Sequence, residues 1–205
     1  MHFHPSNQSL LHDIGLSVYW GECNVGATKP EETGDLYAWG EIETKDKMSW
    51  DNYKWSEGDY NKLTKYNYNE DFGRVDNNAQ LEIADDIAYI KSSGQMRMPT
   101  ERELNELLQT RENSNYQWEH KSLNGKPGLQ ITYKVNGKSI FLPYGGFRTF
   151  TNPYLFYYEQ RGFYWSSTLS TVAPDGAYSL CLESDVVLRA ANRFVGNSVR
   201  PVRSK

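Results

Sequence analysis

Cysteine and histidine are the residues of this chain that most readily act as nucleophiles and bases. There are two cysteines, Cys23 and Cys181, and four histidines, at positions 2, 4, 12 and 120. A cysteine nucleophile needs a base beside it, but three of the histidines lie near the N-terminus and His120 lies in a turn-like segment. We therefore predict no catalytic residue. We also favour two free thiols over a long-range disulfide between Cys23 and Cys181, which is the alternative.

Metal ligands are present without a convincing pattern. His2 and His4 would offer only two ligands on a terminal segment that we expect to be flexible. Asp85 and Asp86 are adjacent, so on a helix they would point about 100° apart, and we expect both to be solvated. Acidic residues in loops could still supply oxygen ligands for a structural calcium ion, namely Asp51, Glu57, Asp59, Glu70 and Asp71. We predict no metal site and no cofactor, with calcium as the open alternative.

Composition limits the class of protein. The chain has 205 residues, which fits one domain over 1–205, with residues 1–13 expected to be flexible. Aromatic residues make up 14% while the mean hydropathy is -0.74, a combination typical of a polar, loop-rich globule. The net charge is -4 without a basic patch, which disfavours nucleic acid as a partner. No apolar run long enough to insert into a membrane is present, and the N-terminus lacks a signal-peptide pattern.

Two stretches have helical patterns. Residues 76–90 place Ile83, Ile87 and Ile90 on one stripe. The second helix is better marked, because Thr100 can act as its N-cap and Glu103 completes a capping box. Its apolar stripe consists of Leu104, Leu107 and Leu108. We therefore predict two helices in the middle of the chain.

Strand patterns stand on both sides of these helices. We expect strands at residues 16–25, 36–42, 163–168, 177–183 and 198–203, and an ordered irregular loop at 50–68. Residues 129–142 predict a hairpin with Asn136 and Gly137 in a two-residue turn. The fold class predicted from this order is α+β, with two helices segregated from antiparallel sheets and long irregular loops.

The C-terminal region, 162–203, has an unusual composition. In the predicted strand 177–183, Tyr178, Leu180 and Leu182 would point inward, while Ser179, Cys181 and Glu183 would point outward. From 168 to 199 there is one Glu and no Lys, Gln, Met or Trp, although these five types make up about a fifth of the chain. Randomising the first two bases of an Asn codon cannot encode any of the five types, and chance in a short window is the alternative.

Several motifs together carry a family resemblance. In order they are GLSVYWGECNVGA, DLYAWGE, RMPTERELNELL, FLPYGGFR, GFYWSST and GNSVRPVR, spread over nearly the whole chain. The chain resembles C-type lectin-like domains of the "major paralogous domain" type, which are distant relatives of the formylglycine-generating enzymes. It is also similar to the variable proteins of diversity-generating retroelements, in which Asn codons near the C-terminus are randomised. Glu183 departs from that pattern.

The resemblance implies a C-type lectin-like fold and a non-enzymatic, receptor- or adhesin-type binding protein. Its ligand, a protein or glycan on a cell or virion surface, would be contacted by a hypervariable surface in 162–203, outside the cell or on a virion. The implied ligand-binding residues are Ser170, Thr171, Val172, Ala173, Pro174, Asp175, Ser179, Cys181, Glu183, Asp185, Val186, Leu188, Arg189, Ala190, Ala191, Asn192, Phe194, Val195 and Asn197. Within that set we expect Val186, Leu188, Phe194 and Val195, together with Val187, to form an exposed apolar patch; for Val187 a core strand is an equal alternative.

Two other functions stay open at this point. One is a non-diversified surface adhesin or carbohydrate-binding domain, for which Trp50 and Trp55 in the aromatic loop could form a sugar platform, although packing of the loop is the simpler interpretation. The other is a formylglycine-generating-type enzyme. That activity relies on a pair of cysteines in the C-terminal part of the fold, where this chain has only Cys181.

Overall fold

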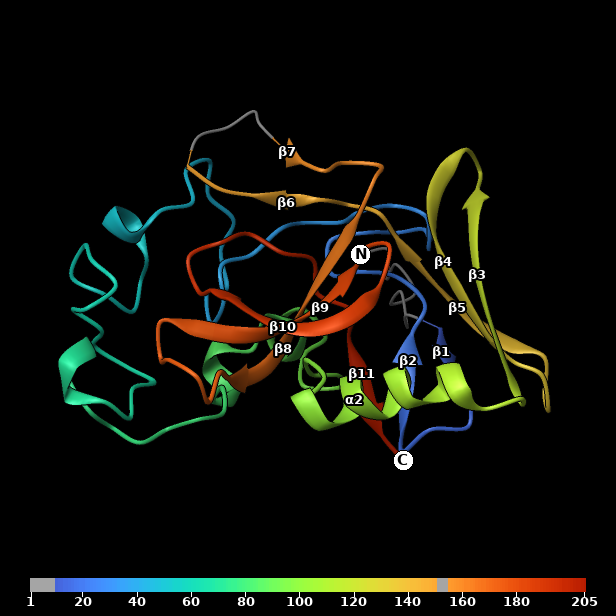
Figure 1. The fold of residues 1–205 in the computed structure, drawn as a ribbon, viewed down its shortest axis with the longest axis horizontal. Coiled ribbons are helices and arrows are strands. Elements are labelled where there is room, and N and C mark those ends of the chain that lie inside the picture. Colours follow the sequence, from blue (N-terminus) through green and yellow to red (C-terminus); the bar gives the residue numbers. More distant parts are fainter. Residues whose placement is uncertain (1–9, 151–154) are drawn as a thin grey trace, which may run out of the picture.

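The structure, a computed structural model, describes residues 10–150 and 155–205 (Figure 1). Within these ranges the chain is mostly β, with eleven strands in four small antiparallel sheets and one helix of more than two turns. The predicted α+β fold with two helices is therefore wrong. The strands are β1 (Leu11–His12), β2 (Val18–Gly21), β3 (Tyr116–Leu123), β4 (Lys126–Tyr133), β5 (Lys138–Pro143), β6 (Phe147–Arg148), β7 (Leu155–Phe156), β8 (Gly162–Leu169), β9 (Gly176–Leu182), β10 (Val186–Asn192) and β11 (Val202–Ser204).

One of the four sheets is central, and the other three lie around it. Their strand orders are β10-β9-β8 for the central sheet, then β1-β2-β11, β3-β4-β5 and β6-β7. In Figure 1 the long loops of the first half of the chain lie at one end and β3-β4-β5 at the other, with the central sheet between them. The helical segments are α1 (Ile87–Lys91), α2 (Glu101–Gln109) and four short 3-10 turns, Trp50–Asn52, Glu70–Phe72, Ile83–Asp85 and Thr110–Glu112.

The first predicted helix, 76–90, is almost entirely absent. Its N-terminal half is not helical, and Leu81 N donates to Ser167 O of β8 at 2.9 Å. Asp86 has an extended backbone and caps the short α1 by accepting from Tyr89 N. Ile83, which the helical stripe would bury, is 64% exposed. Pairing with β8 and the Asp86 cap therefore override the isoleucine spacing.

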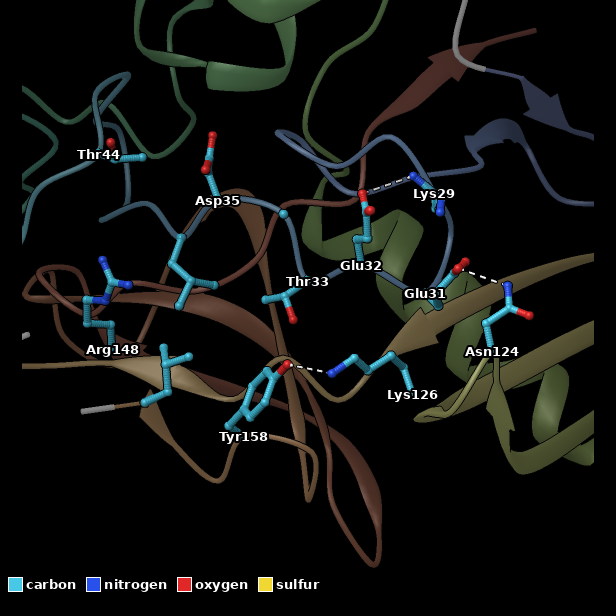
Figure 2. Close-up of a pocket in the computed structure, with 13 residues that line it drawn as sticks. Lys29, Glu31, Glu32, Thr33, Asp35, Thr44, Asn124, Lys126, Arg148 and Tyr158 are labelled. Carbon is cyan, nitrogen blue, oxygen red and sulfur yellow. Dashed lines mark hydrogen bonds between the residues drawn. The ribbon is translucent and has the colours of Figure 1, made fainter. Parts of the chain in front are cut away.

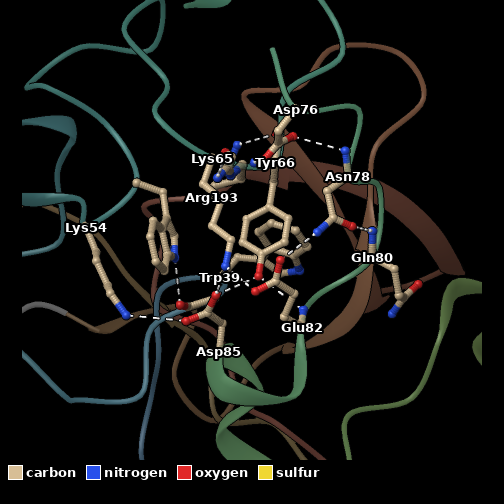
Figure 3. A network of polar contacts seen from close by, with 12 residues as sticks. Trp39, Lys54, Lys65, Tyr66, Asp76, Asn78, Gln80, Glu82, Asp85 and Arg193 are labelled. Atoms are coloured by element: carbon tan, nitrogen blue, oxygen red, sulfur yellow. Dashed lines mark hydrogen bonds and ion pairs between the residues drawn. The ribbon is translucent and has the colours of Figure 1, made fainter. Parts of the chain in front are cut away.

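Asp85 and Asp86 are not solvated as predicted, because both carboxylates are buried. Asp86 accepts hydrogen bonds from the backbone N–H groups of Tyr89 and Met98. Asp85 accepts from Tyr66 Oη at 2.6 Å and from Lys65 Nζ at 2.7 Å (Figure 3). A buried carboxylate requires such partners, and none of them is adjacent in sequence.

The second predicted helix is confirmed as α2. Thr100 Oγ1 accepts from Glu103 N at 3.2 Å, and Glu103 Oε2 accepts from Thr100 N at 2.8 Å, which is the capping box expected from the sequence. Leu104 and Leu107 are buried in the main hydrophobic cluster with Leu180 and Leu182 of β9. The helix therefore covers one face of the central sheet.

The predicted hairpin forms, but not with the predicted turn. Tyr133 pairs with Lys138, so residues 134–137 make a four-residue connection between β4 and β5. A two-residue turn does occur between β3 and β4, where Leu123 pairs with Lys126 across Asn124 and Gly125. Both turn residues have positive φ, 49° and 82°, as a type I′ turn requires. The same Asn-Gly dipeptide thus occurs twice and makes the tight turn at its first occurrence.

The remaining strand predictions are confirmed in part. Strands β8 and β9 match the predicted segments closely, and β2 forms within 16–25. Only the end of 198–203 is a strand, β11, and 36–42 contributes a single bridge from Tyr37 to Asn197. Leu11 and His12 pair with β2, so this part of the segment that we expected to be flexible is in a strand. Residues 1–9, with His2 and His4, lie outside the described residues.

The 50–68 loop is irregular, as predicted, and is fixed by a buried arginine. The guanidinium of Arg193 donates to Tyr53 Oη at 2.9 Å and to the carbonyl oxygens of Tyr66, Lys65 and Pro174 at 2.9–3.0 Å. It also lies 5.1 Å from the Trp39 ring, within the group that Figure 3 shows. One side chain therefore ties this loop to the C-terminal region.

Candidate functional site

The predicted ligand-binding set divides by exposure. The members that are exposed or half-buried are called the C-terminal surface below: Thr171, Val172, Ala173, Asp175, Glu183, Asp185, Leu188, Arg189, Ala190, Ala191, Asn192 and Val195. The members that are buried, and whose predicted exposure is wrong, are Ser170, Pro174, Ser179, Cys181, Val186, Phe194 and Asn197.

Ser179 and Cys181 are buried because both faces of β9 are covered. The face with Leu180 and Leu182 packs against α2, as predicted for inward side chains. On the other face, Trp165 and Ala177 pack with Trp39 and Tyr37. Ser179 is fully buried there and its hydroxyl accepts from Asn197 Nδ2 at 3.2 Å. Successive side chains of β9 still point to opposite faces of the sheet, but both faces are covered. Neither set of side chains is therefore exposed to solvent.

The predicted apolar patch is not formed as expected. Val186 is 5% exposed and packs with Leu188 into the cluster that contains α2. Phe194 is 6% exposed and contacts Trp50, with ring centroids 5.2 Å apart. Of this set, Val187, Leu188 and Val195 are half-buried. Residues 186–188 belong to β10, where only Val186 is buried, so neither the exposed patch nor a fully buried core strand is observed.

Cys181 is poorly suited to nucleophilic chemistry. It is opposite Phe163 on β8 and Val187 on β10. Burial raises its pKa to about 11, so the thiol is protonated at neutral pH. Cys23 and Cys181 are both free thiols, and burial also raises the pKa of Cys23.

The C-terminal surface has two ends. At one end Thr171 Oγ1 and Tyr178 Oη are 2.7 Å apart, and Arg193 N donates to Asp175 O, which holds the 170–175 loop beside Asn192. At the other end Glu183 accepts from Arg161 at 3.0 Å and lies 3.6 Å from Arg189. Strands β9 and β10 run between these ends, pairing Gly176 with Asn192 and Leu182 with Val186.

Strand β10 is an edge of the central sheet. Among the described residues no strand pairs with its outer side, although Arg111 Nη1 donates to Val186 O at 3.1 Å near its start. Arg189, Ala190 and Asn192 are exposed along it. An edge strand with unpaired backbone groups offers both main-chain and side-chain contacts to a partner.

An aromatic hairpin next to β8, at the opposite edge of the central sheet from β10, was not predicted from the sequence. Phe147 of β6 stacks on Phe156 of β7 at 5.4 Å, and its ring meets Phe163 of β8 edge-on at 5.1 Å. The Arg161 guanidinium lies 4.1 Å from the Tyr157 ring and joins the hairpin to Glu183. The signal that could have indicated it is the aromatic density of 147–165.

No group of three or more His, Cys, Asp or Glu side chains is placed to hold a metal ion in 10–150 and 155–205. His120 Nδ1 contacts Tyr144 Oη at the edge of the β3-β4-β5 sheet. Over the same residues, no helix has the length and apolar character to cross a membrane.

Comparison with known protein families, with curated proteins and with solved structures finds no match to this chain.

Proposed function

We propose that this chain is a non-enzymatic, receptor- or adhesin-type binding protein whose ligand contacts the C-terminal surface. The observation that carries the proposal is that the edge strand β10 and its adjoining loops present exposed side chains. The central sheet to which β10 belongs is packed on both faces. Substitution at such exposed positions usually changes stability by less than about 0.5 kcal/mol. The surface can therefore vary while the sheet that carries it stays intact.

We further propose that the chain is related to the variable proteins of diversity-generating retroelements. Support comes from the ordered motifs and from the missing residue types between 168 and 199. Glu183, which a randomised Asn codon cannot encode, forms an ion pair with Arg161, which lies outside residues 168–199. That pair is a physical reason for a fixed glutamate at this position.

Sequencing the DNA beside the gene tests the diversification proposal. We expect a reverse-transcriptase gene and a near-identical template repeat whose adenines correspond to the variable codons of the C-terminal surface. A locus without both would remove diversification and leave an ordinary binding protein. A template that has adenines at the codons of Ser179 and Cys181 as well as at those of Arg189 and Asn192 would contradict the proposal that only the exposed positions are diversified.

The alternative is a non-diversified adhesin or carbohydrate-binding domain that uses the 50–68 loop. Trp50 and Trp55 are both half-buried, and Trp55 Nε1 donates to Gly40 O at 2.8 Å, so both rings also support the fold. Glycan-array binding that is abolished by EDTA, or by Trp50→Ala and Trp55→Ala in variants that still fold, would favour this alternative. For a formylglycine-generating-type enzyme, the buried Cys181 would have to react, and activity lost in Cys181→Ala would be required.

A further inference from the structure

A cavity of about 580 Å³ lies among the 29–36 loop, the β3–β4 turn and the β6–β7 hairpin (Figure 2). Charged side chains that line it are already bound to other groups of the chain. Glu31 accepts from Asn124 Nδ2 at 2.9 Å, and Lys126 Nζ donates to Glu159 at 2.7 Å. Unused hydrogen-bonding groups lie instead along the outer side of β10.

The hydrogen bonds of the central sheet fix which main-chain groups of β10 point outward. In an antiparallel strand, the N–H and C=O of one residue point to one side and those of the next residue to the other. Arg111 Nη1, from the Thr110–Glu112 turn, donates to Val186 O at 3.1 Å, so this carbonyl points away from β9. Leu188 and Ala190, two and four residues further, therefore also direct their N–H and C=O groups away from β9.

The pairing of β8 with β9 gives the same orientation independently. Trp165 N donates to Ser198 O, away from β9, so the neighbouring Tyr164 is a residue whose main chain faces β9. Its partner Leu180 faces β8 in turn, which leaves the main-chain groups of Ser179 to bond with β10. The odd-numbered residues of β10 therefore bond with β9, and the even-numbered ones point outward.

The outward groups of Leu188 and Ala190 have no partner within the described residues. Nothing in 10–150 or 155–205 donates to them or accepts from them on that side. Arg111 occupies only the start of the strand, and Val195 N donates to Asn192 O at 3.0 Å at its end. The two N–H and two C=O groups between these ends match the hydrogen-bonding repeat of one added strand.

The side chains along this edge differ between the two faces of the sheet. Leu188 packs at the border of the cluster that contains α2, and Ala190 lies on the same face and is exposed. Arg189 lies on the opposite face, with its side chain 60% exposed. It is 3.6 Å from Glu183, whose carboxylate also bonds to Arg161 at 3.0 Å. One carboxylate thus serves two guanidinium groups, and Arg189 can accept a second acidic partner.

We propose that the ligand of the C-terminal surface is an extended peptide segment of a protein, which adds to β10 as a fourth, antiparallel strand of the central sheet. Apolar residues opposite Leu188 and Ala190 exchange main-chain hydrogen bonds with them, and an acidic residue between these two lies opposite Arg189. This inference rests on the proposed function and deepens it, because it names the class of ligand and the way in which it binds.

A short peptide of this pattern tests the proposal in NMR titrations of the isotope-labelled whole chain. The probe is Lys-Thr-Val-Glu-Val-Thr-Lys, blocked at both ends, and we expect saturable binding with a Kd on the order of 1 mM or lower. Hydrogen exchange of the Leu188 and Ala190 amides should slow on binding. Methylation of both valine nitrogens should abolish binding, because their N–H groups face β10. Methylation of the glutamate nitrogen, which points away from β10, is the matched control.

A proline substitution tests the same contact from the side of the protein. Ala190→Pro removes one outward N–H, and proline is compatible with an edge position of this kind. We expect it to weaken peptide binding about tenfold, whereas Ala190→Ser keeps the N–H and should have little effect. If Ala190→Pro does not fold, Arg189→Glu replaces it. That variant should bind the peptide about fivefold more weakly and should prefer a peptide with lysine in place of the glutamate.

Several results would show that strand addition is wrong. They are no binding of the peptide, binding that leaves the Leu188 and Ala190 amides unchanged, equal binding of the two methylated forms, and equal affinity in Ala190→Pro and Ala190→Ser. None of them would remove the proposed function, because a ligand can contact the exposed side chains of the C-terminal surface without pairing with β10. Sequencing the DNA beside the gene tests the diversification of that surface independently.

Discussion

Arg193 shows how much of this molecule depends on a single side chain. Its charged side chain is completely buried. Its guanidinium satisfies four acceptors from the 50–68 loop and the 170–175 loop. Arg200 does the same elsewhere, donating to Asn24 Oδ1 at 2.8 Å and to Phe141 O at 2.8 Å. Planar guanidinium groups suit such multiple bonding.

We expect Arg193→Met to lower the free energy of unfolding by about 3 kcal/mol or more, because several buried carbonyl groups lose their donor. Arg193→Lys should rescue little of this, since one ammonium group cannot reach the same set of acceptors. Denaturant unfolding measures both changes. Arg189→Met, an exposed change on β10, is the control and should shift stability by less than about 0.5 kcal/mol. Equal losses at the two arginines would contradict the role given to Arg193.

At the scale of elements, helix α2 is fixed by its capping box and by an ion pair. Burial alone would raise the pKa of Glu103, but hydrogen bonds from the Arg97 guanidinium and from Thr100 N hold that pKa below its ordinary value of 4.5. The folded state therefore binds this proton less readily than the unfolded state. The resulting stability is present above pH 4.5 and is lost as the pH falls through the lowered pKa.

We expect Glu103→Gln to make the free energy of unfolding depend less on pH in the acid range. Glutamine can keep the capping hydrogen bond but not the charge, so near neutral pH the variant should be less stable by about 1 kcal/mol. The difference from wild type should shrink below pH 4.5, where wild-type Glu103 becomes protonated. Urea unfolding at a series of pH values measures this. A difference that is independent of pH would mean that the charge of Glu103 contributes nothing.

The β3–β4 turn offers a second test at this scale. Gly125 has φ +82° and open space where a Cβ would lie, so the only cost of a side chain is the left-handed backbone. We expect Gly125→Ala to destabilise the protein by about 1 kcal/mol. Gly125→Asn should cost less, because Asn tolerates this conformation. Thermal unfolding would compare the two, and equal costs would indicate that the turn conformation is not the cause.

At the scale of the whole molecule, the central sheet decides which positions can vary. Its two faces are covered by α2 and by the aromatic cluster around Trp39, so variation is open only at the edge and in the loops. The exposed members of the predicted set lie on β10 and in the loops, but Val186 of β10 and Ser170 and Pro174 of the 170–175 loop are buried, as are Ser179 and Cys181 of β9. We therefore expect that tolerance of substitution between residues 168 and 199 depends on whether a side chain is buried and not on where it lies in the sequence.

Two libraries would test this division. In one, the codons of Val172, Arg189, Ala190 and Asn192 are randomised; in the other, those of Ser179, Cys181, Val186 and Asn197. We expect most members of the first library to fold, and most of the second to be destabilised by several kcal/mol through overpacking or buried polar groups. Protease resistance of displayed variants measures the folded fraction. Similar folded fractions would contradict the packing described here.

Local signals in the sequence were sufficient for some elements. The capping box and leucine stripe of α2 and the strands β8 and β9 follow from neighbouring residues, because caps, periodicity and alternation act over a few positions. The isoleucine stripe at 76–90 failed because β8 offers that segment backbone partners far along the chain. The predicted two-residue turn at Asn136-Gly137 does not form, because the register of the paired strands β4 and β5 decides which residues connect them.

The sequence by itself determined the loop-rich aromatic character of the chain, its best-capped helix and the two strands at its centre. Only the tertiary structure decided that both faces of β9 are buried, that Arg193 is internal, and that residues from the 29–36 loop, β6 and the β3–β4 turn share one cavity. Alternation along a strand says which side chains share a face, but what covers each face depends on segments far from β9 in the sequence, α2 on one side and Tyr37 and Trp39 on the other.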